Sequence, residues 1–213
     1  MDRYRKGTDF EESDPPVFDT GDDDAAEEGA GGEEEGEDQE PFMGGKVRRK
    51  ASRRREYRGD YLDVPSRPRL MKILEKQGDK TVVFADKVLK FTGSGKMKRR
   101  IFIITDFALY LIDPETDALK RRIALAAVDK LCLSKLSDNF FAIVIPTEYD
   151  LLMASTRKTE IVKVVVDVTK NASDYELEVA VSNRFEYNAA ATLVKEVFFE
   201  EVEGGIKTRI SKK

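Results

Sequence analysis

The stretch of residues 80–113 constrains the fold of this chain most strongly, because two β-rich runs flank a loop that contains two glycines. The runs Val82–Phe91 and 101–112 are enriched in Val, Ile and Phe, as half-buried strands require. Residues 92–95, with the sequence Thr-Gly-Ser-Gly, supply the permissive backbone that a connecting loop needs. The sequence therefore predicts a strand pair that holds this loop at its tip.

The predicted loop lies among cations, since no acidic residue occurs between positions 87 and 105. Lys98 and Arg100 fall on one face of the second strand, with Arg99 on the other. Lys90, at the end of the first strand, can meet Lys98 and Arg100 across the hairpin. Three cations that converge on one small volume can bind a phosphomonoester through charge-assisted hydrogen bonds. The alternative is a solvated loop whose charges discourage aggregation at a sheet edge.

The net charge of −4 conceals a strong asymmetry along the 213-residue chain. Residues 1–45 hold 17 Asp or Glu and 3 Arg or Lys, a net charge of −14, whereas the remaining residues hold 24 acidic and 34 basic ones, a net charge of +10. Such an acidic segment cannot bury enough apolar surface to offset its ordering entropy, so we expect residues 1–45 to form a disordered acidic tail. The tail either solubilises the protein or competes with ligands for the basic body.

A basic arm and linker, residues 46–66, follow the acidic tail. Residues 46–58 hold eight basic residues against Glu56 alone and have too few apolar residues for an apolar helix face. Each basic residue near an anionic membrane contributes about 1 kcal/mol, so the arm predicts nonspecific membrane attraction. Phosphorylation of Ser52 would weaken this attraction. The residues assigned to this contact are Arg48, Arg49, Lys50, Arg53, Arg54 and Arg55.

Residues 67–205 read as one domain of short strands with turn signals between them, which predicts a meandering antiparallel sheet rather than βαβ units. A short helix precedes the sheet, with Ser66 as its N-cap, Pro68 in its first turn and Gly78 at its end. The predicted strands are 82–91, 101–104, 108–112, 119–123, 128–133, 140–145, 150–154, 176–181 and 191–202. For residues 191–202 a helix is the alternative, and the abundance of Thr, Val and Phe favours the strand.

A second helix is predicted over residues 155–170, because Ile161, Val164, Val165 and Val168 recur at spacings of three and four. About seven strands followed by a helix make a partly closed antiparallel barrel that the helix caps. The expected fold class is therefore mainly β with helices (α+β). Residues 206–213 are expected to form a short basic tail.

The residue content argues against catalysis. The chain has no histidine and therefore no Ser-His or Cys-His arrangement. Cys132 stands alone in an apolar run, which predicts a buried structural thiol in a reducing compartment. A nucleotide-binding P-loop is excluded, because position 90 is Lys where Gly is needed and position 97 is Met where Ser or Thr is needed. We expect no enzyme, no metal, no cofactor and no small-molecule substrate.

The sequence also predicts where the protein resides. No apolar run approaches the eighteen residues of a membrane span, and the first residues lack the hydrophobic core of a secretory signal. We therefore expect a cytoplasmic protein that meets membranes peripherally, from their cytoplasmic face, with the cytoskeleton as a further place of association.

Several segments, from about residue 46 to residue 205, resemble the tail homology one domain of class I myosins. They are REYRGDYLDV, TVVFADKVLKF, RRIFIITDFALYLID and LSKLSDNFFAIVI, in the order of that family. The resemblance implies a pleckstrin-homology-like barrel that binds phosphoinositides and acidic phospholipids. The family's signature is a basic residue before the loop between the first two barrel strands and a basic-x-Arg after it. In this chain the resemblance assigns that role to Lys90, Lys98 and Arg100, with Lys96 and Arg99 as further contacts.

The sequence departs from that family in one respect. No motor head, P-loop or light-chain-binding helix precedes the domain in this sequence, so we expect a tail module that stands without the motor. The leading hypothesis is a peripheral adaptor that links anionic phospholipids to the cytoskeleton. The alternative is a cytoskeletal scaffold whose basic surface binds actin or another acidic partner. Nucleic-acid binding is disfavoured, because the arm has little aromatic interleaving and no base-stacking platform is visible.

Overall fold

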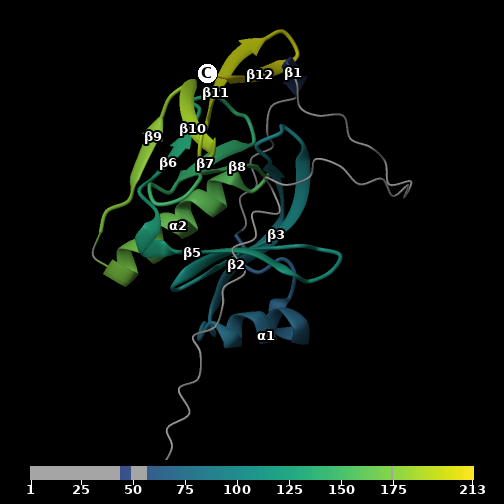
Figure 1. The fold of residues 1–213 in the computed structure, drawn as a ribbon, viewed down its shortest axis with the longest axis vertical. Coiled ribbons are helices and arrows are strands. Elements are labelled where there is room, and N and C mark those ends of the chain that lie inside the picture. Colours follow the sequence, from purple (N-terminus) through teal and green to yellow (C-terminus); the bar gives the residue numbers. More distant parts are fainter. Residues whose placement is uncertain (1–43, 49–56, 174) are drawn as a thin grey trace, which may run out of the picture. The chain divides into compact units, whose positions relative to one another are not determined.

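The computed structural model describes the backbone of residues 44–48 together with residues 57–173 and 175–213, so the expected acidic tail, save its last two residues, lies outside the described residues. The described part is mainly β with two α-helices, as predicted (Figure 1). In chain order the elements are β1 (Gly44–Arg48), η1 (Val64–Ser66), α1 (Pro68–Lys76), β2 (Val82–Phe91), β3 (Met97–Thr105), β4 (Ala108–Ile112), β5 (Leu119–Ala124), η2 (Leu125–Ala127), β6 (Lys130–Leu133), β7 (Phe140–Val144), β8 (Leu151–Ala154), α2 (Lys158–Ser173), β9 (Glu178–Val181), β10 (Arg184–Ala190), β11 (Leu193–Val202) and β12 (Gly205–Lys212).

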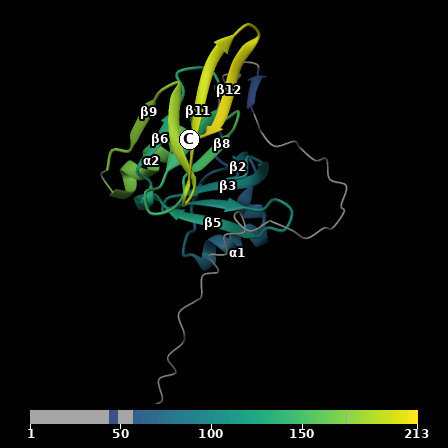
Figure 2. The same ribbon diagram turned by 45° about the horizontal axis from the view of Figure 1, so that its top comes forward.

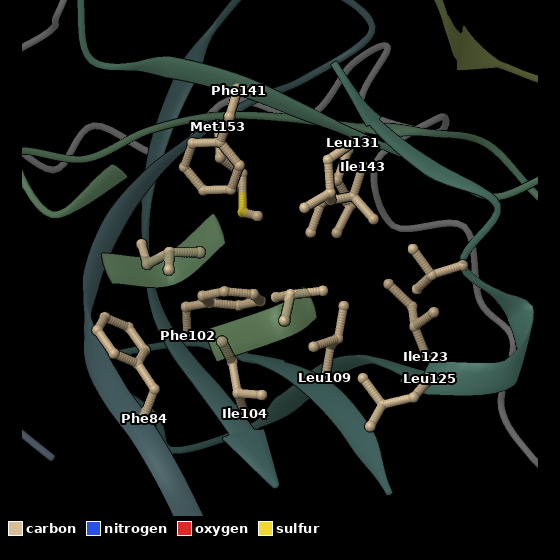
Figure 3. Packing of buried hydrophobic residues seen from close by; sticks show 14 of the residues in the cluster. Phe84, Phe102, Ile104, Leu109, Ile123, Leu125, Leu131, Phe141, Ile143 and Met153 are labelled. Atoms are coloured by element: carbon tan, nitrogen blue, oxygen red, sulfur yellow. The ribbon is translucent and has the colours of Figure 1, made fainter. Parts of the chain in front are cut away.

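Strands β2–β8 form the partly closed antiparallel barrel that the sequence predicts. Their order in the sheet is β5-β4-β3-β2-β8-β7-β6, and β9 adds to β6 in parallel. Each of the seven strands contributes buried residues to one apolar core, among them Phe84, Phe102, Phe141 and Met153. Figure 3 shows these side chains directed toward one another from the surrounding strands. The sheet therefore curls around its own core.

Helix α2 contributes to the same core and caps the barrel. Its buried residues Ile161, Val165 and Val168 pack with the inward-facing residues of the strands. This is the three- and four-residue spacing that predicts the helix, even though its residues are β-branched. The helix begins and ends three residues later than predicted, and before it the Oγ of Ser155 accepts the backbone N–H of Arg157 at 3.0 Å.

Helix α1 packs on the opposite face of the barrel wall. Leu70 and Leu74 are buried with Ala85, Ile103 and Tyr110, which alternate along β2, β3 and β4 with the residues that face the core. Figure 1 accordingly shows α1 and α2 on different sides of β2 and β3. The short amphipathic helix that the sequence predicts is thus confirmed.

The two ends of α1 differ in how well the sequence predicts them. Gly78 follows the helix with a φ of 83°, as expected for a glycine that ends a helix. Pro68 opens it, also as predicted, but the predicted N-cap is wrong. Ser66 belongs to η1, and Arg67 holds the cap position without a side-chain cap.

A second sheet, of strand order β1-β12-β11-β10, packs against the outside of the barrel (Figure 2). Its residues Phe185 and Phe199 are buried with Phe91 and Phe140 of the barrel strands. The ring centroids of Phe140 and Phe199 lie 5.7 Å apart in an edge-on arrangement. In β7, Phe140 directly precedes Phe141, which faces the barrel core, so this strand is apolar on both faces.

The second sheet corrects the expectations for both ends of the domain. Residues 206–213 do not form a tail, because Gly205–Lys212 is strand β12, in which Ile206 and Thr208 are buried. The basic arm begins as a strand, because Gly44–Arg48 pairs with β12. The other arm residues, Arg49, Lys50, Arg53, Arg54 and Arg55, lie outside the described residues, as does Ser52.

The linker before α1 is fastened to helix α2. The carboxylate of Glu160, itself buried, accepts the backbone N–H of Gly59 at 3.0 Å and the hydroxyl of Tyr61 at 2.7 Å. The guanidinium of Arg157 lies over the Tyr61 ring, 3.3 Å from its centroid, and its Nε donates to Asp86 at 2.7 Å. These contacts fasten residues 59–61 to helix α2.

Candidate anion-binding site beside the glycine loop

Lys90 and Lys98 lie directly opposite each other where β2 and β3 meet the glycine loop. Opposite residues of an antiparallel pair project from the same face of the sheet. Arg100 stands two residues further along β3, opposite Val88, and therefore shares that face. Because Val88 belongs to the barrel core, the face is the interior one. The structure thus brings together the three residues that the sequence groups.

The glycine loop is held in one tight conformation. The N–H of Thr92 donates to the carbonyl of Lys96 at 2.9 Å, and the N–H of Gly95 donates to the carbonyl of Thr92 at 3.0 Å. Gly95 has a φ of 92°, which a residue with a Cβ rarely adopts. The hydroxyls of Thr92 and Ser94 are 3.0 Å apart. The loop therefore presents its basic neighbours from a fixed backbone.

The cations differ in exposure. Lys90 is 5% exposed and its Nζ lies 5.3 Å from the centroid of the Tyr149 ring, whereas Lys96 is exposed and Lys98 is half-buried. Arg99 is exposed but lies opposite Leu89, so it projects from the outer face, away from the other cations. Among the described residues, no carboxylate forms an ion pair with Lys96, Lys98 or Arg99. The accessible charge of the site thus lies on Lys96 and Lys98.

Arg100 is buried and engaged by an acid from the next turn. It is 7% exposed, and its Nη1 donates to the backbone carbonyl of Arg99 at 2.9 Å and to the Oδ2 of Asp113 at 3.3 Å. Burial acts to raise the pKa of the Asp113 carboxyl, but the N–H groups of Glu115 and Thr116 and the charge of Arg100 together hold that pKa below its usual range. Asp113 is therefore ionised at neutral pH and partly neutralises Arg100.

Arg121, which the sequence analysis missed, is a fourth cation on this face. It lies opposite Leu111, a core residue, and is 8% exposed. Its Nη2 donates to Glu148 at 2.8 Å and to the carbonyl of Tyr149 at 2.6 Å, and its Cζ lies 3.9 Å from the Tyr149 ring centroid. Its buried Nη1 has no hydrogen-bond partner among the described residues.

The Tyr149 ring therefore lies near two cations from different strands, Lys90 of β2 and Arg121 of β5. A sequence signal could have found Arg121. The alternation of Leu119, Arg121 and Ile123 places a cation on the face that Ile123 buries. A basic residue on an inward face is unusual enough to mark a candidate site.

In the residues that the structure describes, no three His, Cys, Asp or Glu side chains gather to hold a metal ion. Cys132 is buried, as predicted, and burial raises the pKa of its thiol. Neither helix of the described ranges is both long and apolar enough to cross a bilayer. What the arrangement offers is a set of fixed cations able to bind an anion.

Comparison with known families gives a match over residues 48–213, to a family described as unconventional myosin tail, actin- and lipid-binding. Among relatives, the chain is 31% identical over 169 residues to the myosin IB heavy chain of Dictyostelium discoideum, covering 76% of this chain and 15% of that one. It is 25% identical over 161 residues to human unconventional myosin-Ib, covering 71% of this chain and 14% of that one. The chain thus corresponds to a small part of the length of these relatives.

Solved structures with some similarity include the DH/PH fragment of PDZRHOGEF in complex with human RhoA, at a TM-score of 0.40 and 13% identity over 48% of this chain and 32% of that chain. The hSac2 domain of the human phosphoinositide phosphatase Sac2 matches with a TM-score of 0.42 and 14% identity, over 53% of this chain and 83% of that chain.

Proposed function

This chain belongs to the unconventional myosin tail family, and we propose that its barrel is a peripheral membrane module that binds anionic phospholipids. In this proposal a phosphoinositide headgroup binds beside the glycine loop, at Lys90, Lys98 and Arg100, with Lys96 at the rim and Arg121 behind them. The observation that carries the proposal is the direct opposition of Lys90 and Lys98 across the β2–β3 ladder.

Two lysines directly opposite each other lower the stability of a sheet, so the requirements of folding do not explain them. Like charges directly opposite on neighbouring strands destabilise the pair, and here Arg100 and Arg121 add two further cations on the same face. Arg100 pairs with Asp113, and Arg121 pairs with Glu148. A ligand with several phosphates would form charge-assisted hydrogen bonds with such a group of cations, which supports a binding role for the grouping.

The rigidity of the loop favours a ligand of defined shape. The hydrogen bonds between Thr92, Gly95 and Lys96 fix the loop before any ligand arrives, so little conformational entropy is lost on binding. Charge-assisted hydrogen bonds from ammonium groups to phosphate are about twice as strong as neutral ones. A phosphorylated headgroup therefore fits the site better than a diffuse anionic surface alone.

Association with the membrane and the cytoskeleton follows from the same proposal. The family description names lipid and actin as what such tails bind, and the basic residues of the arm add nonspecific attraction to an anionic leaflet. The protein would then act as an adaptor at the cytoplasmic face of a membrane. Catalysis has no part in it, since the matched family is a tail family rather than a motor.

Co-sedimentation of the full chain with vesicles tests the proposal. We expect binding to rise from phosphatidylcholine to phosphatidylserine vesicles and again when a phosphoinositide is added. Lys98→Ala should reduce the affinity for phosphoinositide vesicles about fivefold, the effect of one charge at an anionic surface. The matched control is Lys72→Ala, which removes an exposed lysine from α1. Equal binding by the two variants would overturn the site assignment.

A protein partner is the second candidate function, and one surface feature favours it. Phe198 is 37% exposed on β11 and lies opposite Arg184 on one side and Arg209 on the other. An exposed aromatic ring between two arginines suits an acidic protein surface such as an actin filament. Co-sedimentation with filaments distinguishes this candidate, because Phe198→Ala should weaken filament binding and leave vesicle binding unchanged.

A further inference from the structure

The turn between β10 and β11 is uncharged in a chain where 37% of residues are charged. From Asn188 to Val194 the sequence is Asn-Ala-Ala-Ala-Thr-Leu-Val, without an ionisable side chain. Ala190 pairs with Leu193, so Ala191 and Thr192 form the tip, and both are exposed. Val194 is a further exposed apolar residue beside the tip. The turn thus offers solvent a small, neutral and largely apolar surface.

This turn lies against the glycine loop of the candidate site. A Cβ built on Gly93 would stand 3.5 Å from the carbonyl oxygen of Ala189, 3.8 Å from a methyl group of Leu193 and 3.9 Å from the Cβ of Ala190. The two hairpin ends, β2–β3 from the barrel and β10–β11 from the second sheet, therefore lie next to each other, although almost a hundred residues separate them in sequence.

The buried carboxylate of Asp150 holds the turn in this position through hydrogen bonds. Asp150, 3% exposed, accepts the N–H of Asn188 at 2.7 Å and its side-chain amide at 3.2 Å, and the N–H of Asp150 donates to the carbonyl of Asn188 at 2.8 Å. Tyr149, the residue before Asp150, is the ring that contacts both Lys90 and Arg121. The apolar turn and the cation site are thus fastened to the same short segment.

The usual residue preferences of hairpin turns do not explain why these residues occupy this one. Two-residue hairpin turns favour Asn-Gly, Asp-Gly or Gly-containing pairs that accept a positive φ. Ala191 and Thr192 do not form such a pair. In the described residues the non-glycine residues with a positive φ are Asp63 and Asp117, so neither Ala191 nor Thr192 adopts one. A bulge between Asn188 and Ala190 accommodates the chain. Small neutral residues stand where turn-forming ones would be expected.

We propose that the β10–β11 turn is a second membrane contact, which enters the headgroup region of the bilayer while the cations beside the glycine loop bind phosphate. This inference rests on the proposed membrane function and adds to it an apolar element from outside the barrel. The occupant is the bilayer surface itself, because the turn is continuous with the lysine site and carries no charge to be desolvated. Membrane binding then depends on two neighbouring hairpin ends that touch the surface together.

A single tryptophan tests this directly, because the chain contains none. Thr192→Trp places the reporter at the tip of the turn. With phosphoinositide vesicles we expect its emission to shift to the blue and to be quenched by brominated lipid. With a soluble inositol phosphate in place of vesicles we expect no shift, since that ligand supplies the phosphates without the bilayer.

The matched control is Phe107→Trp, a conservative change at a residue that is 58% exposed. Phe107 lies in the turn at the other end of β3, whose nine residues span roughly 30 Å. Its emission should not respond to vesicles. If instead the Phe107→Trp reporter shifts and the Thr192→Trp reporter does not, the protein meets the membrane with its other end and the proposal is overturned.

Sedimentation of the same samples separates this inference from the proposed function. Vesicles that pellet the protein while the reporter of Thr192→Trp stays in water would overturn the second contact and leave the phosphate site standing. Protein that does not pellet with any anionic vesicle would overturn both. In addition, Thr192→Asp should lower vesicle affinity about fivefold, the effect of one charge at an anionic surface, without changing the affinity for soluble inositol phosphate. An equal loss for both ligands would place the effect in the phosphate site and contradict the proposal.

Discussion

The guanidinium of Arg100 and the carboxylate of Asp113 lie 3.3 Å apart on the interior face of the barrel. The basic stretch around the glycine loop has no acid of its own, so the fold supplies one from the turn after β4. Under the proposed function this carboxylate would compete with an anionic headgroup for Arg100 and would limit how much of the cationic charge the headgroup can use.

Asp113→Asn should raise the affinity of the full chain for phosphoinositide vesicles about fivefold, because one negative charge leaves the site. Vesicle co-sedimentation measures the change. Asp117→Asn is the matched control, since it removes the same charge from the same turn, where Asp117 faces Arg69 at 3.9 Å rather than Arg100. A rise of equal size in both variants would show a general effect of net charge and would contradict competition at Arg100.

The same carboxylate makes stability depend on pH. The pKa of folded Asp113 lies below its ordinary value of 3.8, so its contribution to stability is fully present above that value and is lost as the pH falls through the folded pKa. The difference in unfolding free energy between the parent and Asp113→Asn should therefore shrink when urea titrations at pH 7 are repeated at pH 3. A difference that stays constant over this range would contradict the assigned ionisation.

Much of the fold could be predicted because the barrel strands are runs of apolar and β-branched residues with turn signals between them. Strands β2 and β4 have the predicted bounds, whereas β3 begins at Met97 rather than at residue 101. The additional part of β3 is the basic stretch 97–100, which lies outside the predicted strand bounds although Lys98 and Arg100 were expected to share a strand face. Its register is set by hydrogen bonds to β2 and not by side-chain hydrophobicity, so composition gave no sign of it.

The second sheet could not be predicted for a related reason. Residues 206–213 look like a basic tail, yet Ile206 and Thr208 alternate inward once β11 supplies a partner. In β10 the buried Phe185 and Tyr187 alternate in the same way over only seven residues. Pairing between β1 and β12 joins the first described strand to the last, a long-range contact that local patterns do not encode.

The candidate site was predicted in position but not in its charge balance. Lys90, Lys98 and Arg100 share a face because strand geometry alone requires it. Their partners Asp113, Tyr149 and Arg121 come from other turns and strands. A sequence pattern can therefore name the cations, whereas the acids and rings that set their availability depend on the closed barrel.

Relief of the opposed lysines should stabilise the protein. Lys98→Thr removes a like charge directly opposite Lys90 and places a β-branched residue in a strand, so the free energy of unfolding should rise by about 0.5 kcal/mol. Lys87→Thr is the control, because Lys87 lies in the same strand pair opposite Ile101. Urea denaturation measures both. A gain in the control as large as that in Lys98→Thr would assign the effect to strand propensity.

Arg121 should not tolerate replacement by lysine. Lys keeps the charge but loses the paired donors to Glu148 and the planar stack on Tyr149, so Arg121→Lys should lower the free energy of unfolding by about 1–2 kcal/mol. The control is Arg184→Lys, since Arg184 forms an exposed ion pair with Glu196 and should change stability by less than about 0.5 kcal/mol. Similar losses in the two variants would mean that the stability of the barrel does not depend on the contacts of Arg121 with Glu148 and Tyr149.

The attachment of the linker to the barrel should depend on the absence of a side chain at Gly59. Gly59 and Gly78 both have a positive φ, of 74° and 83°, so alanine at either position costs about 1–2 kcal/mol from backbone strain. A Cβ on Gly59 would also stand 2.7 Å from the carbonyl oxygen of Val83, whereas nothing lies within 4 Å of one on Gly78. Gly59→Ala should therefore lower the free energy of unfolding by about 3 kcal/mol or more, and Gly78→Ala by about 1–2 kcal/mol.

Urea titrations of the two glycine variants measure this difference under identical conditions. The excess loss in Gly59→Ala reflects displacement of the segment whose N–H donates to Glu160 and whose neighbour Tyr61 stacks with Arg157. If the segment is displaced, Glu160→Gln should cost less in the Gly59→Ala background than in the parent, because the hydrogen bond it weakens is already broken. Equal losses in the two glycine variants, or additive effects with Glu160→Gln, would mean that the linker is not held through this contact.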